Sequence, residues 1–373
     1  MRVLHVIPSL DSTQGGIRSA LVSALGAMAA AGIQAECAVV GQPQPPLPDM
    51  AIHVFAPTAP RLTRASRELR RWLASHAGDY TAVIAHTLWL SPTRYAIDAA
   101  VAAGVPAWLV PHGMLDPDAV AHHRWRKRLR WVQGEARRVR AARLLFSTQA
   151  DAARSSATAR RSTLPSGVVP NPVEPAWYQA ADPRPARRVL CLNRWHPRKG
   201  VLELVQALLA LHGQGVDFTA EFAGAVSDDA YARQVRQLAA PLIQAGVLRV
   251  HGILSPAQLR ELAAPGGILV HPATGFENFG MVIAEAAAAG LAVLASPRAL
   301  LTPEMAQAGA VEACEPTASA LAQGLRELLS DAPRQVALGR AGKVYAQQHF
   351  TLPQVGRQWL EVLGTHAAAG AKL

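Results

Sequence analysis

The first half of the chain alternates short apolar runs with longer segments of helical spacing. The runs lie at residues 2–7, 35–40, 82–85, 107–110 and 144–147. Short, nearly continuous apolar runs separated by helix-length segments are typical of parallel sheets, because their strands are buried on both faces. The pattern therefore predicts a doubly wound α/β domain in this half of the chain.

The pattern starts again after a Pro-rich stretch at 182–185. New apolar runs lie at 189–192, 218–223, 248–251, 268–271 and 292–295, and they predict a second doubly wound parallel sheet. We therefore expect an α/β protein with Rossmann-like domains at 1–184 and 185–350 and a last segment at 351–373. Such sheets bind ligands beyond the carboxyl ends of their strands, so two facing domains would hold a ligand in the cleft between them.

The composition agrees with two globular domains in a reducing compartment. At 373 residues the chain exceeds the size at which a single core usually divides. Cys37, Cys191 and Cys314 lie far apart and outside any CxxC or Cys/His cluster, which indicates neither a disulfide framework nor a zinc site. The N-terminus reads as a strand rather than a signal peptide, and the apolar stretch at 283–295 is too short to span a membrane. We expect a cytoplasmic protein that is soluble or peripheral.

Most of the positive charge lies in the first half. Residues 1–184 hold 21 Lys and Arg against 12 Asp and Glu, a net charge of +9, whereas residues 185–373 hold 16 against 14, a net charge of +2. A positive field of this kind attracts phosphates, nucleic acid or anionic lipid, and its sign does not choose among them.

The strongest chemical signal runs from a strand end into an Ala-rich helix at 271–285, with the sequence HPATGFENFGMVIAE. Backbone N–H groups at the helix start, near 278–281, can hold a diphosphate with help from the helix dipole. Glu277 lies in the loop and can accept hydrogen bonds from sugar hydroxyls, and ribose hydroxyls would satisfy the carboxylate of Glu285 within the helix. Taken singly, either glutamate could also be an ordinary acidic residue at a helix start or on a solvated face.

A second segment, LCLNRWHPRKG at 190–200, is predicted to form a strand, a Pro-containing turn and a helix start. Cations at the mouth of such a turn can clamp a leaving diphosphate, because they neutralise the charge that grows as the glycosidic bond breaks. Arg194 and Lys199 are the candidates. The alternative is that both are solvated, as Arg and Lys in loops usually are.

Two weaker elements follow strands of the first domain. Gly15 and Gly16 come after the first strand, where adjacent glycines let the backbone approach a phosphate, although a Gly-Gly pair is more often a turn. His112 lies in PHGMLDP at 111–117, directly after the run at 107–110. A histidine there could contact a sugar hydroxyl or the reacting centre, although most single histidines do neither.

Together these segments resemble family 4 of the retaining glycosyltransferases. The Glu-x7-Glu block of that family is matched by Pro272, Glu277, Phe279, Gly280, Glu285 and Ala286. Its Gly-Arg-x2-Pro-x-Lys-Gly block is matched by 193–200, with Asn193 where Gly is usual. PHGMLDP is similar to a block of bacterial members that build envelope polysaccharides, in which the histidine reaches the donor sugar. A second departure is Gly290-Leu-Ala-Val, where the family has Gly-Thr/Ile-Pro-Val, and it puts the geometry of that loop in question.

The resemblance implies a GT-B pair of Rossmann-like domains, with a C-terminal helix from Leu352 that crosses back to the first domain. It also implies a nucleoside-diphosphate sugar donor, no metal cofactor, and front-face attack with the leaving phosphate as proton acceptor. It carries over His112 and Glu277 as catalytic residues. The donor-binding residues that it carries over are Gly15, Gly16, Arg194, Lys199, Gly252, Ile253, Asn278, Phe279, Gly280, Met281 and Glu285.

A strongly basic segment at 122–140 has apolar residues at helical spacing, namely Trp125, Leu129, Val132, Ala136 and Val139. The spacing predicts one amphipathic helix with cationic flanks. Arg124, Arg126, Lys127 and Arg130 are therefore candidate contacts to an anionic acceptor or an anionic membrane surface. The alternative is a helix that packs by its apolar stripe and is otherwise solvated. No helix-turn-helix, zinc finger or stacking-aromatic sheet accompanies the charge, which argues against nucleic acid.

These observations favour a retaining glycosyltransferase that moves a hexose-type sugar from a UDP- or GDP-sugar. The expected acceptor is an anionic saccharide, most simply linked to a lipid diphosphate at the inner face of the cytoplasmic membrane, in lipopolysaccharide or exopolysaccharide biosynthesis. A nucleotide-sugar epimerase and a catalytically silent GT-B scaffold remain as alternatives. A nicotinamide dehydrogenase is disfavoured, because a glycine fingerprint after the first strand is missing.

Overall fold

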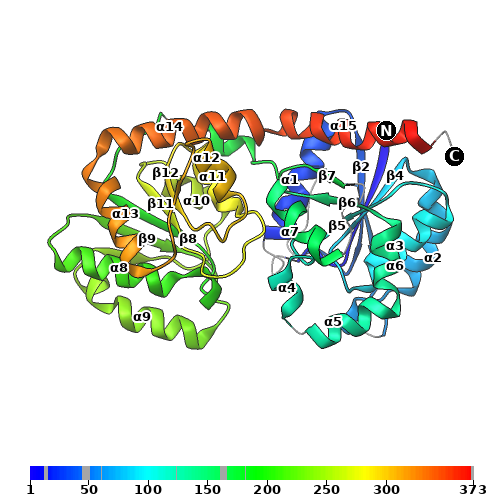
Figure 1. Ribbon diagram of the computed structural model, residues 1–373, viewed down its shortest axis with the longest axis horizontal. Helices are drawn as coiled ribbons and strands as arrows, with labels where there is room; N and C mark the ends of the chain where they lie inside the picture. Colours follow the sequence, from blue (N-terminus) through cyan, green and yellow to red (C-terminus); the bar gives the residue numbers. More distant parts are fainter. Residues whose placement is uncertain are drawn as a thin grey trace. The chain divides into compact units, whose positions relative to one another are not determined.

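The computed structural model describes residues 1–11, 16–43, 51–59, 61–122, 124–159, 166–180 and 182–370. The chain divides into two compact units, Met1–Pro172 together with Leu352–Leu373, and Val173–Thr351 (Figure 1). Each unit is a parallel sheet with helices on both faces, which confirms the predicted fold class. The boundary expected from the sequence, between 184 and 185, lies further along the chain than this division.

The sheet of the first unit has the strand order β3-β2-β1-β4-β5-β6-β7 within the described residues, and its strand pairs are parallel. The strands are β1 (Arg2–Ile7), β2 (Gln34–Val40), β3 (Ile52–Phe55), β4 (Ala82–His86), β5 (Ala107–Val110), β6 (Arg143–Phe146) and β7 (Ser166–Val168). Because β1, β4 and β5 are neighbours, residues at their carboxyl ends come close together even though long segments of chain separate them.

Helices cover both faces of this sheet (Figure 1). One face packs against α2 (Arg67–His76), α3 (Ser91–Ala102) and α6 (Ala136–Ala141), and the other against α1 (Gly16–Ala30) and α15 (Leu352–Gly370). The remaining helical segments are η2 (Arg61–Thr63), η3 (Ala77–Asp79), α4 (Pro117–Ala121), α5 (Arg124–Arg130), the π-helical turn η4 (Trp131–Glu135) and α7 (Gln149–Ala159). The C-terminal helix thus belongs to the first unit, as expected. Its Gly356 lies so close to α1 that a Cβ there would be 2.3 Å from the carbonyl oxygen of Ala27.

The second unit has the strand order β10-β9-β8-β11-β12-β13 within the described residues, and its strand pairs are again parallel. The strands are β8 (Arg188–Leu192), β9 (Thr219–Ala223), β10 (Leu248–Val250), β11 (Ile268–His271), β12 (Ala292–Ala295) and β13 (Glu312–Ala313). The helices are η5 (Pro175–Gln179), η6 (Pro197–Lys199), α8 (Val201–Gly213), α9 (Asp229–Gln244), α10 (Pro256–Ala263), α11 (Met281–Ala288), α12 (Thr302–Gln307), α13 (Ala318–Ser330) and α14 (Ala332–His349).

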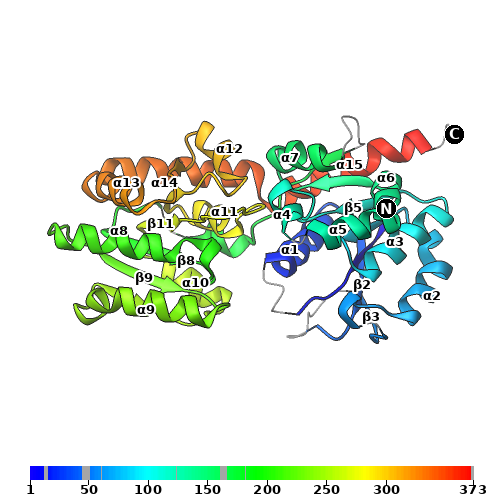
Figure 2. The same ribbon diagram turned by 60° about the horizontal axis from the view of Figure 1, so that its bottom comes forward.

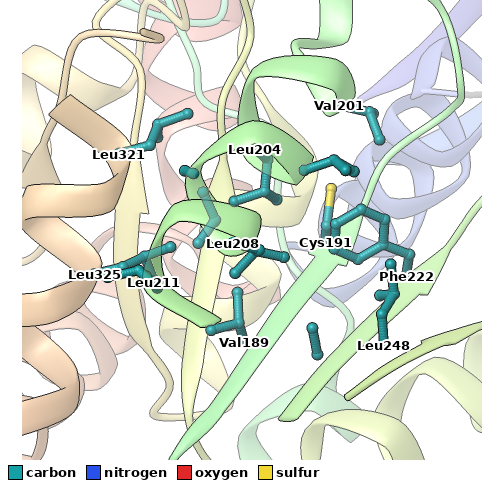
Figure 3. Packing of buried hydrophobic residues seen from close by; sticks show 14 of the residues in the cluster. Val189, Cys191, Val201, Leu204, Leu208, Leu211, Phe222, Leu248, Leu321 and Leu325 are labelled. Carbon is teal, nitrogen blue, oxygen red and sulfur yellow. The ribbon is translucent and has the colours of Figure 1, made fainter. Parts of the chain in front are cut away.

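The alternation of side chains along β8 shows how this sheet is buried on both faces. Val189 and Cys191 belong to the core under α8, α9 and α13, whereas Leu190 belongs to the core under α11 and α14. Figure 3 shows Leu204, Leu208 and Leu211 of α8, at helical spacing, packed against β8. Burial of one such leucine contributes roughly 1.5–3 kcal/mol, so this layer holds the strand ends that carry the site in fixed positions.

All ten predicted strands are present, and their observed bounds differ from the prediction by one residue at most. β3, β7 and β13 were not predicted. β7 and β13 are only three and two residues long, so they carry too few positions for a periodic pattern. Within the residues that the structure describes, no helix is both long and apolar enough to span a membrane.

Candidate active site

The Glu277 loop connects β11 to α11 in the second unit, and backbone hydrogen bonds hold it in place. The Glu277 N–H donates to the carbonyl oxygen of Arg298 at 3.0 Å, and the Glu277 carbonyl accepts from the Leu300 N–H at 3.0 Å. The loop therefore pairs with the segment after β12 through an isolated parallel β-bridge between Glu277 and Ala299. A carboxylate on such a backbone has a defined position.

The side chain of Glu277 forms an ion pair with Lys199, whose Nζ donates to Oε2. Burial would raise the pKa of Glu277, but Lys199, His271 and Arg194 together outweigh burial and hold the pKa below its usual value. Glu277 is therefore a charged carboxylate at neutral pH. The exposed Arg194 and the half-buried Lys199 provide positive charge beside it.

The segments at 190–200 and 271–285 make close backbone contact at Gly200, which has φ of 68°. A Cβ at Gly200 would come within 1.8 Å of the carbonyl oxygen of Pro272. The N–H groups of Thr274 and Gly275 both donate to the carbonyl oxygen of Arg198 at 3.1 Å. This contact between the η6 turn and the Glu277 loop is what brings Lys199 to Glu277.

Asn193, the departure from the usual glycine, is accommodated by burial. Its side chain is 5% exposed, and its amide nitrogen donates to the sulfur of Cys191 at 3.7 Å. The backbone of Asn193 also lies very close to Gly224. A Cβ at Gly224 would be 1.9 Å from the Asn193 carbonyl oxygen, so the residue without a side chain is the one at 224. Asn193 is therefore a buried residue directly before the exposed Arg194.

The start of α11 is shaped by Phe279 and Gly280. Phe279 is 3% exposed and packs edge-on against Phe350, with ring centroids 5.7 Å apart. Gly280, with φ of 81°, turns the chain into the helix, and Asn278 and Met281 flank this turn. The first N–H groups of a helix lack partners within it and favour an anion, and here they lie directly after Glu277 in the chain.

Glu285 lies on α11, one turn beyond this helix start. Burial and the nearby carboxylate of Glu174 raise the pKa of Glu285 to about 7, whereas Arg260 lowers it by less. Arg260 also forms an ion pair with Glu174 at 3.5 Å. A buried carboxylate in this setting would be stabilised by hydroxyl donors from a ligand.

His112 follows β5 in the first unit, at φ of 50°. Its Nε2 lies 2.9 Å from Nδ1 of His86, and Nε2 of His86 lies 2.8 Å from Nδ1 of His5. Burial lowers the pKa of His112 to about 4 and that of His5 to about 3, and it lowers the pKa of His86 as well. The three rings are therefore neutral at pH 7.

The remaining predicted donor-binding positions are mostly backbone. Gly15 lies outside the described residues. Gly16 is the exposed first residue of α1, with open space where a Cβ would be. The Gly252 carbonyl accepts from the Gly224 N–H at 3.0 Å after β10, and Ile253 beside it is 80% exposed.

The basic segment is not the single amphipathic helix that the spacing predicts. Gly134, at φ of 115°, interrupts it between α5 and α6. Val139, after the break, is 2% exposed, whereas Trp125, Leu129 and Val132 are 65%, 53% and 79% exposed. The apolar stripe therefore packs only at its C-terminal end, which corrects both the continuous helix and the alternative of a fully packed stripe.

The cations of α5 differ in their surroundings. Lys127 Nζ donates to the carbonyl oxygen of Ala119, and Arg130 donates to that of Trp89 at 3.4 Å. Arg124, Arg126 and Arg128 are exposed, and Arg126 lies over the Trp125 ring at 5.1 Å. Within α5, the exposed positive charge is thus carried by these three arginines.

The structure brings Arg194, Lys199 and Glu277 together, with Glu285 on the helix that follows. His112, Gly16 and the basic segment belong to the first unit. Sequence reasoning missed five residues: His5, His86, Glu174, Arg260 and His271. His5 lies within the first strand, and His86 and His271 are the last residues of their strands. A histidine in or at the end of an apolar run is a pattern that could have indicated these three. Nothing in the neighbouring sequence indicates Glu174 or Arg260.

Among the described residues no group of three or more His, Cys, Asp or Glu side chains is arranged to hold a metal ion.

Comparison with known proteins finds a family match within the second unit. Residues 179–345 match the family model "Glycosyl transferases group 1". The chain is 32% identical over 219 residues to phosphatidyl-myo-inositol mannosyltransferase of Mycobacterium tuberculosis, a match that covers 56% of this chain and 55% of the relative. The alignment thus spans just over half the length of the curated relatives.

Solved structures agree over nearly the whole chain. Anabaena Alr3699/HepE in complex with UDP and glucose has a TM-score of 0.76 at 20% identity, covering 98% of this chain and 100% of that chain. WaaG, a glycosyltransferase involved in lipopolysaccharide biosynthesis, has a TM-score of 0.69 at 17% identity, with coverage of 98% and 100%. At these identities the likeness shows the fold. The resemblance seen in the sequence is confirmed in the fold and in the family match: the chain has the two-domain GT-B fold, and residues 179–345 of its second unit match the group 1 glycosyl transferases.

Proposed function

We propose that this protein is a retaining glycosyltransferase that moves a hexose-type sugar from a nucleoside-diphosphate sugar to an anionic saccharide acceptor. The observation that carries the proposal is the local arrangement in the second unit. The contact of Gly200 with Pro272 holds Lys199 against Glu277, directly before the start of α11. Cations, a helix start and a charged carboxylate are the groups that a diphosphate and a sugar need.

The diphosphate of the donor would bind at Arg194, Lys199 and the N–H groups that begin α11. These groups neutralise the charge that develops as the bond between the sugar and the phosphate breaks. For this reason we propose that turnover needs no metal ion. The complex of Anabaena HepE with UDP and glucose supports a uridine nucleotide as the first ligand to test.

Glu277 would hold the sugar by accepting hydrogen bonds from its hydroxyl groups. The family resemblance adds His112 as a proposed contact of the donor sugar. The acceptor hydroxyl attacks the anomeric carbon on the face that the phosphate leaves, and its proton passes to a phosphate oxygen. The bond from the anomeric carbon to the diphosphate breaks as the new glycosidic bond forms. Glu285 would accept hydrogen bonds from the ribose.

The acceptor proposal rests on the charge and exposure of α5. Figure 1 shows α5 at the lower edge of the first unit, and in the turned view of Figure 2 it lies in front of the sheet. Exposed arginines flank the exposed Trp125 and Leu129 on this helix. A cationic helix with an uncovered apolar stripe suits the surface of an anionic bilayer.

The relatives support an acceptor of this class. One is a phosphatidyl-myo-inositol mannosyltransferase, and WaaG is involved in lipopolysaccharide biosynthesis. We therefore propose a lipid-linked acceptor in envelope polysaccharide or glycolipid synthesis, with the enzyme bound peripherally at the cytoplasmic membrane face.

Calorimetric titration with UDP and GDP, with and without EDTA, followed by a donor hydrolysis screen, tests the enzymatic proposal. One nucleotide should bind equally well in EDTA, and the matching sugar nucleotide should be turned over. NMR of the glycoside product should show the anomeric configuration of the donor. An inverted product would contradict retention, release of an epimerised free sugar without a glycoside would indicate the epimerase, and binding of neither nucleotide would contradict the proposal.

A further inference from the structure

A buried chain of hydrogen bonds connects α1 to His112 in the first unit. The thioether sulfur of Met28 lies 3.2 Å from Nε2 of His5. Nδ1 of His5 lies 2.8 Å from Nε2 of His86, and Nδ1 of His86 lies 2.9 Å from Nε2 of His112. Met28, His5 and His86 are 0%, 0% and 3% exposed, so water does not compete for these contacts.

The direction of such a chain is a collective property. A neutral imidazole has one nitrogen that donates and one that accepts. Each contact between two rings needs one hydrogen and one lone pair, so the tautomer of any ring determines the tautomers of the other two. Two arrangements are possible: all three rings carry hydrogen on Nε2, or all three carry it on Nδ1.

Met28 distinguishes between the two arrangements, because a thioether sulfur accepts hydrogen bonds but cannot donate them. With hydrogen on Nε2, His5 donates to Met28, and every contact of the chain is made. With hydrogen on Nδ1, the lone pair of His5 Nε2 faces the lone pairs of the sulfur, and this buried contact is lost.

We infer that Met28 sets the tautomer of His112 through His5 and His86, so that Nδ1 of His112 presents a lone pair rather than an N–H group. Nδ1 of His112 is the ring nitrogen that takes no part in this hydrogen-bond chain and can therefore face a ligand. His5, His86 and Met28 are thus positioning residues for His112. The consequence for the ligand rests on the proposed function: His112 would accept a hydrogen bond from a hydroxyl group of the donor sugar and would not donate one to a sugar oxygen.

The backbone conformation of His112 is consistent with a functional position. Its φ of 50° lies in the left-handed region, which residues other than glycine adopt infrequently. The contact from His112 Nε2 to His86 fixes the orientation of the ring at this strained point.

Tautomers can be read directly from long-range ¹H–¹⁵N correlation spectra of protein labelled with ¹⁵N-histidine, without ligand at pH 7.5. Signals are assigned by their loss in His112→Asn and His86→Asn. We expect the Nε2–H form for all three rings in the wild type. An Nδ1–H form of His86 or His112 would overturn the inference.

The matched substitutions are Met28→Leu and Met305→Leu, two buried methionines that are both 0% exposed. A leucine preserves volume but cannot accept a hydrogen bond, so Met28→Leu should raise the Nδ1–H population of all three rings to a sizeable fraction. Met305→Leu, in the second unit, should leave the spectra unchanged. Pure Nε2–H signals in folded Met28→Leu would exclude Met28 as the determinant.

Measurements of binding affinity connect the tautomer of His112 to the ligand. If half of the His112 rings change tautomer, the apparent affinity for the sugar part of the donor should fall about twofold, because only the competent fraction binds. The affinity for the nucleoside diphosphate alone should not change. Because the spectra are recorded without ligand, they decide the tautomer even if the protein transfers no sugar, and a failed donor screen leaves them valid.

Discussion

The α-carbon of Gly200 lies against the backbone of Pro272, so closely that a Cβ would come within 1.8 Å of the Pro272 carbonyl oxygen. This contact joins the turn that carries Lys199 to the loop that carries Glu277. It explains why a residue without a side chain is required at this position. The geometry of the ion pair depends on it.

We predict that Gly200→Ala destabilises the protein by roughly 2–4 kcal/mol, because the left-handed backbone and the clash with Pro272 both oppose a side chain. Gly246→Ala is the matched control: its φ is also positive, at 70°, but nothing lies within 4 Å of the added Cβ. That change should cost only about 1 kcal/mol. Urea denaturation measures both, and equal effects would show that the contact with Pro272 does not matter.

Glu277→Ala should lower kcat on the order of 10²-fold or more, because the proposed function places this charged group at the reacting sugar. The affinity for the nucleoside diphosphate should not weaken, since Lys199 is released from its ion pair. The control is Glu261→Ala, an exposed glutamate on α10. Steady-state kinetics and calorimetry separate the two effects, and unchanged transfer would contradict the role of Glu277.

Nucleotide binding should depend on pH through Glu285, whose pKa is raised to about 7. In the proposed function, ribose hydroxyls donate more strongly to the charged carboxylate than to the protonated acid, so affinity is highest above this pKa and falls below it. Between pH 8 and pH 6 the affinity should fall by up to about tenfold, because the charged fraction of Glu285 falls by that factor. Glu285→Gln should bind more weakly at pH 8 and lose this part of the pH dependence. Titration of the nucleotide phosphates affects the wild type and Glu285→Gln equally. Identical pH profiles of nucleotide affinity in the two proteins would therefore exclude Glu285 as the cause.

The buried histidines should make the first unit sensitive to acid. His5 has a usual pKa of 6.5 that burial lowers to about 3. Because the pKa of His5 is lower in the folded state than in the unfolded state, the folded state is most stable above the unfolded pKa of 6.5. This stability is lost as the pH falls from 6.5 towards the folded pKa of about 3. The loss should be about 1.4 kcal/mol per pH unit for each histidine that stays neutral.

Denaturation at pH 7.5 and pH 5.5 tests this sensitivity. His5→Gln should be less stable than the wild type at pH 7.5 but should lose less stability between the two values. His212→Gln, which changes an exposed histidine, should follow the wild type. A wild-type pH dependence that persists in His5→Gln would show that His5 is not the acid-sensitive group.

Binding to anionic vesicles should require the exposed arginines of α5. Replacing Arg124, Arg126 and Arg128 with Ser should weaken binding, because each surface cation contributes about 1 kcal/mol near an anionic bilayer. Binding should also fall steeply as ionic strength rises, since charges are screened over about 8 Å at physiological salt.

The control removes the same charge from the second unit, by changing the exposed Arg233, Arg249 and Arg340 to Ser. Vesicle flotation with neutral and anionic lipids compares the two triple variants. If both bind like the wild type, or if neutral vesicles bind equally well, α5 is ordinary solvated surface and the acceptor proposal loses its support.

The sequence by itself determined the strands and the chemistry at their ends. An apolar run such as 268–271 reports its own burial, and a matching block such as 271–285 reports a family, because both signals are contained within a few neighbouring residues. For this reason the sheet, the Glu277 loop and the charge asymmetry could be predicted.

Only the tertiary structure decided which of these groups meet. Lys199 and Glu277 are 78 residues apart in the chain, and His5 and His86 are 81 apart, so their contacts depend on strand order and on the packing of glycines rather than on local spacing. The basic segment shows the same limit. Its apolar stripe has regular spacing, but Gly134 interrupts the helix and the first half of the stripe finds no partner, because burial depends on the elements that a face meets.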